Sequence, residues 1–489
     1  MKYRTIFNHL MLQFVVLFAG CIASFAADSG MENGWSIPGD MVLWTRQPAT
    51  EWGGDCSALG NGRLGGLVFG QVERERIQLN DATLWAGGPY DASNPDARRF
   101  VPEMRRLLFD GKFGEAQDLS YRLFARVIDV ADYQTIGDMR FRFAGHNGSV
   151  DYRRELDLES GILRISYTTG DARFVREMFM SYPDQVLVMR LTCNKPGRLA
   201  FAMTMDSLQN HKTEAVADDH LVMRGQNTDH KIINEIQEKV TPGKPFPVVK
   251  SAMTFKAHAR ILTEGGQVKR VQSRIFGGDA RECLQVDSAD SVTIVYTAAT
   301  NYKRYNDATA DPAAICAKHL DAACGKSYEV LRRRHTDDFR PLMRRVSLDL
   351  GSDPELERLS TTERLSRMRR GGQDPGLIVQ HFQYARYLTL AQCREGILPV
   401  NPHNLWSDKL KPGWMGRWTF DMNTELCYWP VESCNMSEAA HPLTDFMEQL
   451  AQSGARTARN HWGRRGWVAD IGTDIWMAKS IEKGARISA

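Results

Sequence analysis

The pattern of apolar residues changes from strand-like to helical after about residue 300, and that change constrains the fold more than any single motif. From Tyr133 to about Thr300, short runs alternate between apolar and polar residues or are rich in β-branched residues, with polar turns between them. Many short strands at close spacing are typical of a large antiparallel β-sandwich. From Asp311 onward the segments are helical, and no strand run is visible up to Trp476. The sequence therefore predicts a β domain followed by a helical domain.

Two local features precede the strand-rich stretch. Residues 59–66 read LGNGRLGG, a Gly-rich turn between apolar runs. The turn lacks the Lys-Ser/Thr pair of a phosphate-binding loop, so we predict a tight hairpin. Residues 95–128 are predicted to be helical, because Phe100, Met104 and Leu107 fall at i, i+4 and i+7 on one helix face. We expect them to form a helical insertion in the β domain.

Charged helices are predicted between the two domains. Residues 328–345 carry many charges and few apolar side chains, which predicts a solvated linker helix. Residues 355–370 indicate another charged helix. Residues 375–393 indicate an amphipathic helix that offers Leu377 and Phe382, among others, to a core.

The first thirty residues have the features of an export signal. A short basic start is followed by a mostly apolar run over residues 9–25 and by small residues up to Ala26. We predict a signal peptide over residues 1–26 and an exported protein, periplasmic or extracellular. Lipid attachment at Cys21 is the alternative. No later stretch is long and apolar enough to span a membrane.

Charge and cysteine content exclude several classes of function. The chain has 62 basic and 59 acidic residues, a net charge of +3, which gives no electrostatic reason to expect a nucleic-acid partner. Its nine cysteines show no CxxC pair and no metal-ligand spacing. We therefore expect no metal and no cofactor. Buried free thiols are the main expectation, and a Cys427–Cys434 bridge is the alternative.

One short stretch concentrates the residue types of a sugar site. Residues 413–430 read GWMGRWTFDMNTELCYWP, which places aromatic rings beside amides and carboxylates. Rings cover the apolar C–H faces of a sugar, and amide or carboxylate groups bind its hydroxyls. The alternative is a buried helix start with aromatic packing.

A series of motifs then gives the chain a family resemblance. They are LGNGRLG at 59–65, ERERIQLN at 73–80, TLWAGGP at 83–89, YQ and GD at 133–138, SYPDQV at 181–186, AATNY at 298–302, VSLDLG at 346–351, NTE and YWP at 423–430, and GWVA and TDIW at 466–476. Their order and spacing, from about residue 41 to 476, resemble glycoside hydrolase family 95, whose members are mainly inverting α-L-fucosidases.

The resemblance implies a multidomain β + α architecture. An N-terminal antiparallel β-sandwich (super-sandwich) would occupy residues 41–303 and a helical linker residues 304–372. An (α/α)6 barrel, incomplete in this chain, would begin at residues 373–476. Residues 477–489 look unrelated to the family.

The resemblance also implies hydrolysis with inversion, in which one carboxylic acid protonates the leaving oxygen and a second carboxylate activates water. In the family, two asparagines of an Asn-x-Asn motif help to hold that water. Here Asn423 matches the second asparagine, while Asp421 replaces the first and can accept a hydrogen bond but cannot donate one when ionised. Thr419 replaces a histidine near the C5 substituent of the sugar, so L-fucose and L-galactose both stay open.

Further sugar contacts are predicted from the same resemblance. Trp406, Trp414 and Trp476 are candidate sugar platforms, with barrel packing as the alternative. Asp474 is a candidate contact to a sugar hydroxyl, with a structural cap as the alternative.

The acid Glu and base Asp of the family are expected beyond Ala489, so a truncated product or fragment is predicted. One hypothesis is an exported fucosidase-type hydrolase acting on fucosylated or L-galactosylated glycans. Another is an inactive remnant or a carbohydrate-binding β-sandwich protein. A third hypothesis is a phosphorylase, since related sandwich-plus-barrel enzymes use phosphate in place of a base.

Overall fold

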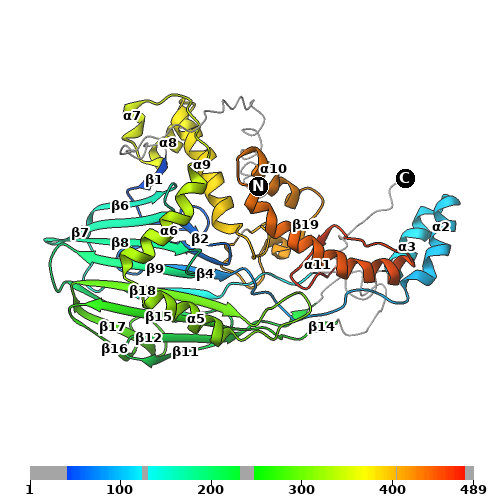
Figure 1. The fold of residues 1–489 in the computed structure, drawn as a ribbon, viewed down its shortest axis with the longest axis horizontal. Coiled ribbons are helices and arrows are strands. Elements are labelled where there is room, and N and C mark those ends of the chain that lie inside the picture. Colours follow the sequence, from blue (N-terminus) through cyan, green and yellow to red (C-terminus); the bar gives the residue numbers. More distant parts are fainter. Residues whose placement is uncertain (1–40, 124–129, 232–246, 404, 479–489) are drawn as a thin grey trace. The chain divides into compact units, whose positions relative to one another are not determined.

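The computed structural model describes residues 41–123, 130–231, 247–403 and 405–478. These residues form two antiparallel sheets followed by a helical region (Figure 1). All of them belong to one unit of the chain, Gly39–Ala489. The predicted signal peptide, and all but the first two residues of the predicted tail, lie outside the described residues.

The larger sheet has nine antiparallel strands. In spatial order they are β1 (Val42–Thr45), β6 (Val150–Asp157), β7 (Ile162–Thr169), β8 (Ala172–Ser181), β9 (Val186–Cys193), β18 (Ser291–Thr300), β15 (Thr254–Glu264), β12 (His220–Gln226) and β11 (Asn210–Ala217). In sequence, the strands of this sheet run from Val42 to Thr300. The sheet therefore contains residues from both ends of the predicted β domain.

The smaller sheet has seven antiparallel strands. In spatial order they are β16 (Gln267–Ser273), β17 (Arg281–Ala289), β10 (Leu199–Asp206), β5 (Gly137–Arg142), β4 (Arg76–Asp81), β3 (Leu64–Val68) and β2 (Ser57–Gly60). A further short pair joins β13 (His230–Lys231) to β14 (Val248–Val249).

Both sheets contribute to one hydrophobic core. Met178 and Met189 of the larger sheet are buried in the same cluster as Phe141 and Met203 of the smaller one. Successive strand residues point to opposite faces, so the period-two pattern places alternate side chains in this core. The predicted antiparallel sandwich is confirmed.

The Gly-rich hairpin is also confirmed, because β2 pairs with β3 around residues 61–63. Its glycines are explained by close approach of the helical region. A Cβ atom on Gly60 would lie 2.5 Å from the carbonyl oxygen of Ala391, and one on Gly65 would lie 2.7 Å from Cγ of Leu405. Both distances are shorter than van der Waals contact. Ala391 and Leu405 can therefore approach the hairpin this closely only because residues 60 and 65 have no side chain.

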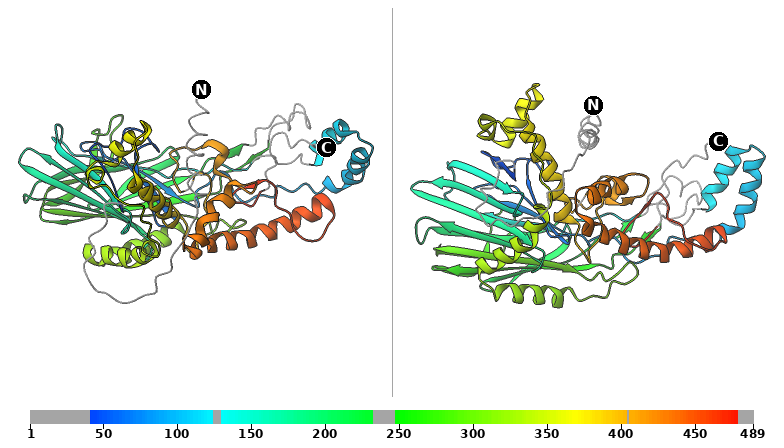
Figure 2. Two further views of the ribbon diagram at one scale, coloured as in Figure 1. Left: turned by 90° about the horizontal axis from the view of Figure 1, so that it is seen from above. Right: turned by 45° about the horizontal axis from the view of Figure 1, so that its top comes forward.

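The structure has helices in the predicted insertion. After a 3₁₀ turn (η3, Ala97–Phe100), α2 (Val101–Phe109) and α3 (Phe113–Leu123) form a small separate cluster in which Met104 and Leu107 are buried. In both views of Figure 2 this hairpin lies beside the C-terminal end of α11. The backbone N–H of Asn94 donates to Nε2 of His461 at 2.8 Å, which fixes that contact.

Two helices pack on the larger sheet. α5 (Pro312–Cys324) contacts β15 and β18, and α6 (Tyr328–Met343) contacts β8. The prediction of a solvated helix at 328–345 is wrong, because α6 buries Leu331, His335, Thr336, Phe339 and Met343. Its charged residues occupy the remaining faces of the helix. The high share of charged residues therefore concealed a narrow apolar stripe that packs on the sheet.

The helical region continues with α7 (Pro354–Glu357), α8 (Thr361–Arg369), α9 (Pro375–Gln392), α10 (Asn423–Ser433) and α11 (His441–Thr457). Short 3₁₀ turns lie at Gly413–Gly416 (η4) and Ser437–Ala440 (η5), and a π-helical turn at Ala458–Trp462 (η6) ends α11. The expectation that this region has no strands is wrong: β19 (Trp418–Thr419) pairs with β20 (Gly472–Thr473). A pair of two-residue strands is too short to show any periodicity.

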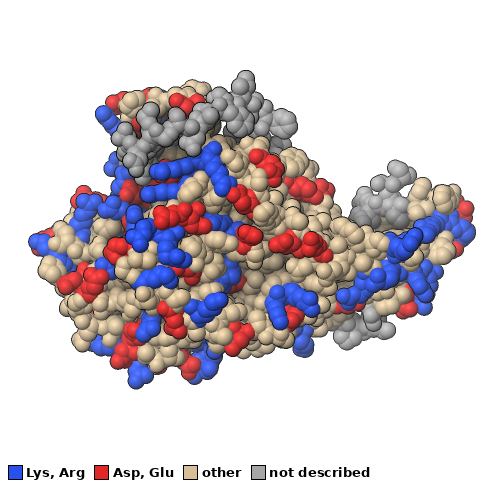
Figure 3. Space-filling model, in the orientation of Figure 1, with Lys and Arg blue, Asp and Glu red and all other residues tan. Residues whose placement is uncertain are grey.

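All eight cysteines of the described residues are free, so the alternative of a Cys427–Cys434 bridge is wrong. Half of them, including Cys393 and Cys434, are buried. Lys and Arg lie among Asp and Glu across the face drawn in Figure 3. Within the described part of the chain, no helix is long and apolar enough to cross a membrane.

Candidate functional site

The segment 413–430 is anchored at its centre by Trp418. The Trp418 ring is buried and stacks on Trp85 of the sandwich domain, with centroids 4.9 Å apart and 20° between the planes. Its Nε1 donates to the carbonyl oxygen of Pro399 at 3.1 Å, and Phe446 of α11 packs on it with centroids 4.5 Å apart. The Trp418 side chain therefore has a structural role, and its contacts fix the position of the residues on either side.

The turn before Trp418 presents an aromatic ring at the surface. Trp414 and Met415 both have positive φ, at 55° and 57°, a conformation that costs free energy for residues with side chains. The carbonyl oxygen of Met415 accepts a 2.8 Å hydrogen bond from the backbone N–H of Tyr133, which helps to hold this turn. Trp414 is 70% exposed, as a sugar platform requires.

The two water-positioning candidates lie at the start of α10. Asp421 and Asn423 are both exposed, and neither side chain has a hydrogen-bond partner among the described residues. A carboxylate near a helix N-terminus is also favoured by the helix dipole. The Asp421 carboxylate and the Asn423 amide are therefore available to bind water or a ligand.

Helix α10 is held from one side and exposed on another. The Tyr428 hydroxyl accepts a 3.0 Å hydrogen bond from the backbone N–H of Val400, and Thr424 is buried. Burial raises the pKa of Tyr428 well above its usual value, so the hydroxyl stays neutral. Trp429 of the same helix is 60% exposed. The exposed large apolar side chains Trp414, Met422 and Trp429 thus all lie within the 413–430 segment.

Thr419 lies in a different environment from Asp421. It is buried, and its backbone pairs with Gly472 in the β19–β20 ladder. No contact in the structure assigns its side chain to a ligand, so its role at the C5 substituent stays a prediction.

Asp474 is completely buried and its carboxylate has four donors. Oδ2 accepts from the Tyr90 hydroxyl at 2.9 Å and from the backbone N–H of Ala131 at 2.8 Å. Oδ1 accepts from the backbone N–H groups of Trp476 at 2.9 Å and Ala478 at 3.1 Å. These bonds tie the segment after β20 to two loops of the sandwich domain. The geometry favours the structural cap over a contact to a sugar hydroxyl.

Two of the predicted platforms are packed inside the protein. Nε1 of Trp406 donates to the carbonyl oxygen of Leu59 at 2.9 Å, and Nε1 of Trp476 donates to that of Ala86 at 2.9 Å. Both side chains belong to the main hydrophobic core. Because their rings are covered by protein, burial favours the packing alternative for Trp406 and Trp476.

Polar residues of the β4 motif proved to have a positioning role that was not predicted. Nε2 of Gln78 and Nδ2 of Asn80 donate to the carbonyl oxygen of Ser407 at 2.8 and 3.0 Å, and Oδ1 of Asn80 accepts from the Ser407 backbone N–H at 3.1 Å. The Tyr133 hydroxyl donates to the carbonyl oxygen of Leu405 at 2.9 Å. These residues hold the loop that precedes the candidate site. The amide side chains of Gln78 and Asn80 within a strand could have indicated this role, because buried amides need hydrogen-bond partners.

The described residues contain no group of three or more His, Cys, Asp or Glu side chains that could hold a metal ion.

Comparisons with known proteins agree with this architecture. The model of "Glycosyl hydrolase family 65, N-terminal domain" matches residues 43–305, and that of "Glycosyl hydrolase family 95 catalytic domain" matches residues 327–489. A β-sandwich joined to such a catalytic domain defines a glycoside hydrolase. The chain belongs to glycoside hydrolase family 95, with an N-terminal domain of the family 65 type.

Two relatives carry fucosidase names. "Alpha-L-fucosidase 2" of Arabidopsis thaliana is 32% identical over 470 residues, which cover 94% of this chain and 54% of the relative. "Probable alpha-fucosidase A" of Aspergillus niger is 27% identical, with 87% of this chain and 52% of the relative covered. The chain thus spans about half the length of these relatives.

Among solved structures, a putative kojibiose phosphorylase from the human microbiome superposes with a TM-score of 0.50 at 12% identity. The match covers 87% of this chain and 50% of the phosphorylase chain. At this identity the likeness shows a shared fold, a sandwich followed by helices of the (α/α)6 type.

Proposed function

We propose that this protein is an exported glycoside hydrolase that removes terminal α-linked L-fucose, or L-galactose, from glycans. The observation that carries the proposal is the free pair at the start of α10, where the Asp421 carboxylate and the Asn423 amide are exposed without partners among the described residues. The fucosidase names of the two relatives supply the reaction and the sugar.

In this proposal Asp421 and Asn423 hold the attacking water. A carboxylate accepts a hydrogen bond from one water O–H, and the amide N–H₂ donates to the water oxygen. Such a pair fixes the direction of the water lone pair before reaction, which lowers the barrier. The general acid and general base of the inverting reaction are not assigned to residues of this chain.

The exposed Trp414 ring is the proposed platform for the sugar. Its indole face offers apolar contact to the C–H face of a pyranose. Trp429 of α10 is the second exposed ring of the same motif.

A carbohydrate-binding protein without hydrolysis is the second candidate. It is favoured by the two sheets, which share one hydrophobic core, while α8 contacts the edge strand β1 and α9 contacts the edge strand β2. Such a sandwich needs no catalytic group to bind a glycan.

Incubation of the folded 489-residue chain with 2′-fucosyllactose separates the two candidates. Release of L-fucose supports the hydrolase, and the β-anomer as first product supports inversion. Binding of the trisaccharide without release supports the second candidate.

A further inference from the structure

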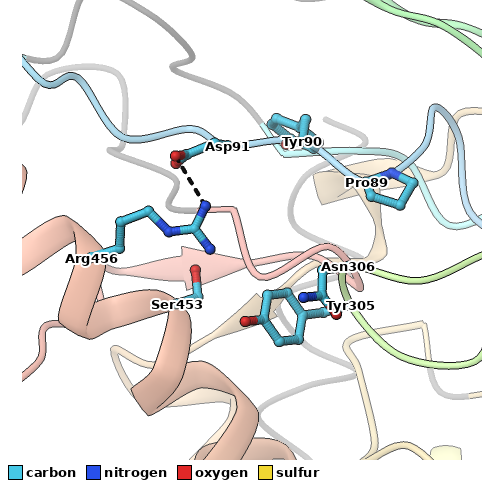
Figure 4. A pocket seen from close by; sticks show the side chains of 7 residues that line it. All are labelled: Pro89, Tyr90, Asp91, Tyr305, Asn306, Ser453 and Arg456. Carbon is cyan, nitrogen blue, oxygen red and sulfur yellow. Dashed lines mark hydrogen bonds and ion pairs between the residues drawn. The ribbon is translucent and has the colours of Figure 1, made fainter.

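A cavity of about 240 Å³ lies between sandwich loops and helix α11, apart from the 413–430 segment (Figure 4). Its lining comes from three elements far apart in the sequence: Pro89, Tyr90 and Asp91; Tyr305 and Asn306; and Ser453 and Arg456. Ligand sites are common at such boundaries between domains. Pockets for drug-sized ligands measure about 300–1,000 Å³, so this one suits a smaller molecule.

The walls of the cavity are fixed by contacts outside it. The Tyr90 hydroxyl donates to the buried Asp474, and the Tyr305 side chain belongs to the main core. The Ser453 hydroxyl donates to the carbonyl oxygen of Met477 at 3.0 Å, which leaves its lone pairs available to a donor. A pocket built this way is largely formed before a ligand enters.

The charges in the cavity compensate each other. Nη1 of Arg456 lies 3.0 Å from Oδ2 of Asp91, and Oδ1 of Asp91 accepts from the Ser93 backbone N–H at 2.9 Å. Burial opposes ionisation of Asp91, but hydrogen bonds from Ser93 and Arg456 hold its pKa below the usual value. The carboxylate therefore stays ionised and neutralises the guanidinium. A neutral ligand fits this site better than an anion.

The remaining groups can donate and accept hydrogen bonds around that volume. The Asn306 side chain is exposed and has no hydrogen-bond partner among the described residues. Arg456 keeps N–H groups beyond the one facing Asp91. The rings of Tyr90 and Tyr305 supply apolar surface between these polar groups. Donors and acceptors whose charges cancel, placed beside rings, are what a neutral sugar ring with several hydroxyls needs.

We propose that this cavity binds one neutral pyranose unit, with Arg456, Asp91 and Asn306 on its hydroxyls and Tyr305 beside its C–H face. We take the pyranose to be one sugar unit of the glycan substrate, and this assignment rests on the proposed function. Binding itself does not depend on hydrolysis, so the two proposals fail separately.

Titration of the full chain with L-fucose and with lactose, followed by saturation-transfer NMR, tests the site. We expect saturable binding of at least one of these sugars with Kd in the mM range, as a few hydrogen bonds in a shallow site provide. Asn306→Ala and Arg456→Met should each weaken it by about 10-fold. The control is Arg459→Met, an exposed arginine of η6 outside the cavity, which should bind as the parent does.

Three results would overturn the proposal. The first is no saturation by either sugar, provided that the circular dichroism and melting of the chain show it folded. The second is equal sugar binding by the parent and both cavity variants, which would place the sugar elsewhere. The third is competition by sodium sulfate at equal concentration, lost in Arg456→Met, which would make the site an anion site. None of these readouts requires turnover, so an inactive hydrolase leaves the test intact.

Discussion

Trp85 and Trp418 stack with ring centroids 4.9 Å apart, although they lie more than three hundred residues apart in the chain. Trp85 lies in the TLWAGGP motif that follows β4, and Trp418 is the centre of the candidate site. The stack joins the sandwich domain to the helical region at the point where Asp421 and Asn423 follow within five residues. The site therefore depends on the fit between the two domains.

Replacement of Trp418 by Ala should lower the free energy of unfolding by about 3–5 kcal/mol, because a buried ring and its stack are lost. Urea unfolding followed by circular dichroism measures the change. Trp414→Ala is the matched control. Its ring is mostly exposed, so its effect should stay within about 0.5 kcal/mol. Equal effects for both variants would contradict the anchoring role of Trp418.

Asp474→Ala should lower the free energy of unfolding by about 3 kcal/mol, because buried donors lose their acceptor. Tyr90→Phe, which removes one of those donors, should cost about 1 kcal/mol. Thermal melting of both variants shows whether Asp474→Ala is destabilised more than Tyr90→Phe. A sugar-binding Asp474 would instead give a normal melting temperature and weaker glycan binding in Asp474→Asn.

Alanine at Gly60 should destabilise the protein by about 1–3 kcal/mol, since the new Cβ would lie 2.5 Å from a backbone oxygen of α9. Gly54→Ala is the control, because the nearest atom to its added Cβ is 3.9 Å away. Chemical denaturation of the two variants gives the comparison. A tolerated Gly60→Ala would show that the hairpin and α9 are not in close contact.

His335 should make the protein sensitive to acid. Burial lowers the pKa of its imidazole to about 4 in the folded protein, against about 6.5 for an unperturbed histidine. Because only the unfolded chain takes up this proton between those values, stability is intact above pH 6.5 and falls as the pH drops toward 4. The contribution of this one group is at most about 3 kcal/mol at pH 4.

His335→Phe keeps a ring against Phe179 and Phe339 but cannot take up a proton. The slope of unfolding free energy against pH, measured between pH 4.5 and 6.5, should decrease in this variant. The slope is compared rather than the absolute stability, so any packing loss cancels. An unchanged slope would mean that His335 is protonated in the folded state.

The sandwich was predictable because many short strands with period-two alternation can be recognised in this sequence. The β2–β3 hairpin followed from its glycines, although the partner that requires them, Ala391 of α9, could not be read from local sequence. Helix α6 was misjudged for the opposite reason, since its charged faces hid the stripe around Leu331 and Phe339.

The site was less predictable than the fold. Trp414, Trp406 and Trp476 are the same residue type, and only the structure separates the exposed ring from the two buried ones. The cavity near Arg456 was not predicted, because Asp91, Asn306 and Arg456 meet only through long-range contacts. Sequence patterns report local chemistry and do not place distant loops side by side.

The most direct test of the account is the rate of L-fucose release from 2′-fucosyllactose by a parent protein with a complete family 95 catalytic domain and by its Asn423→Ala and Asn147→Ala variants. Asn147 is an exposed asparagine outside the motif and serves as the control. We predict that the parent and Asn147→Ala release fucose at equal rates, while Asn423→Ala is slower by about 10²-fold, as the loss of one preorganised contact causes. Equal rates for all three proteins would contradict the account.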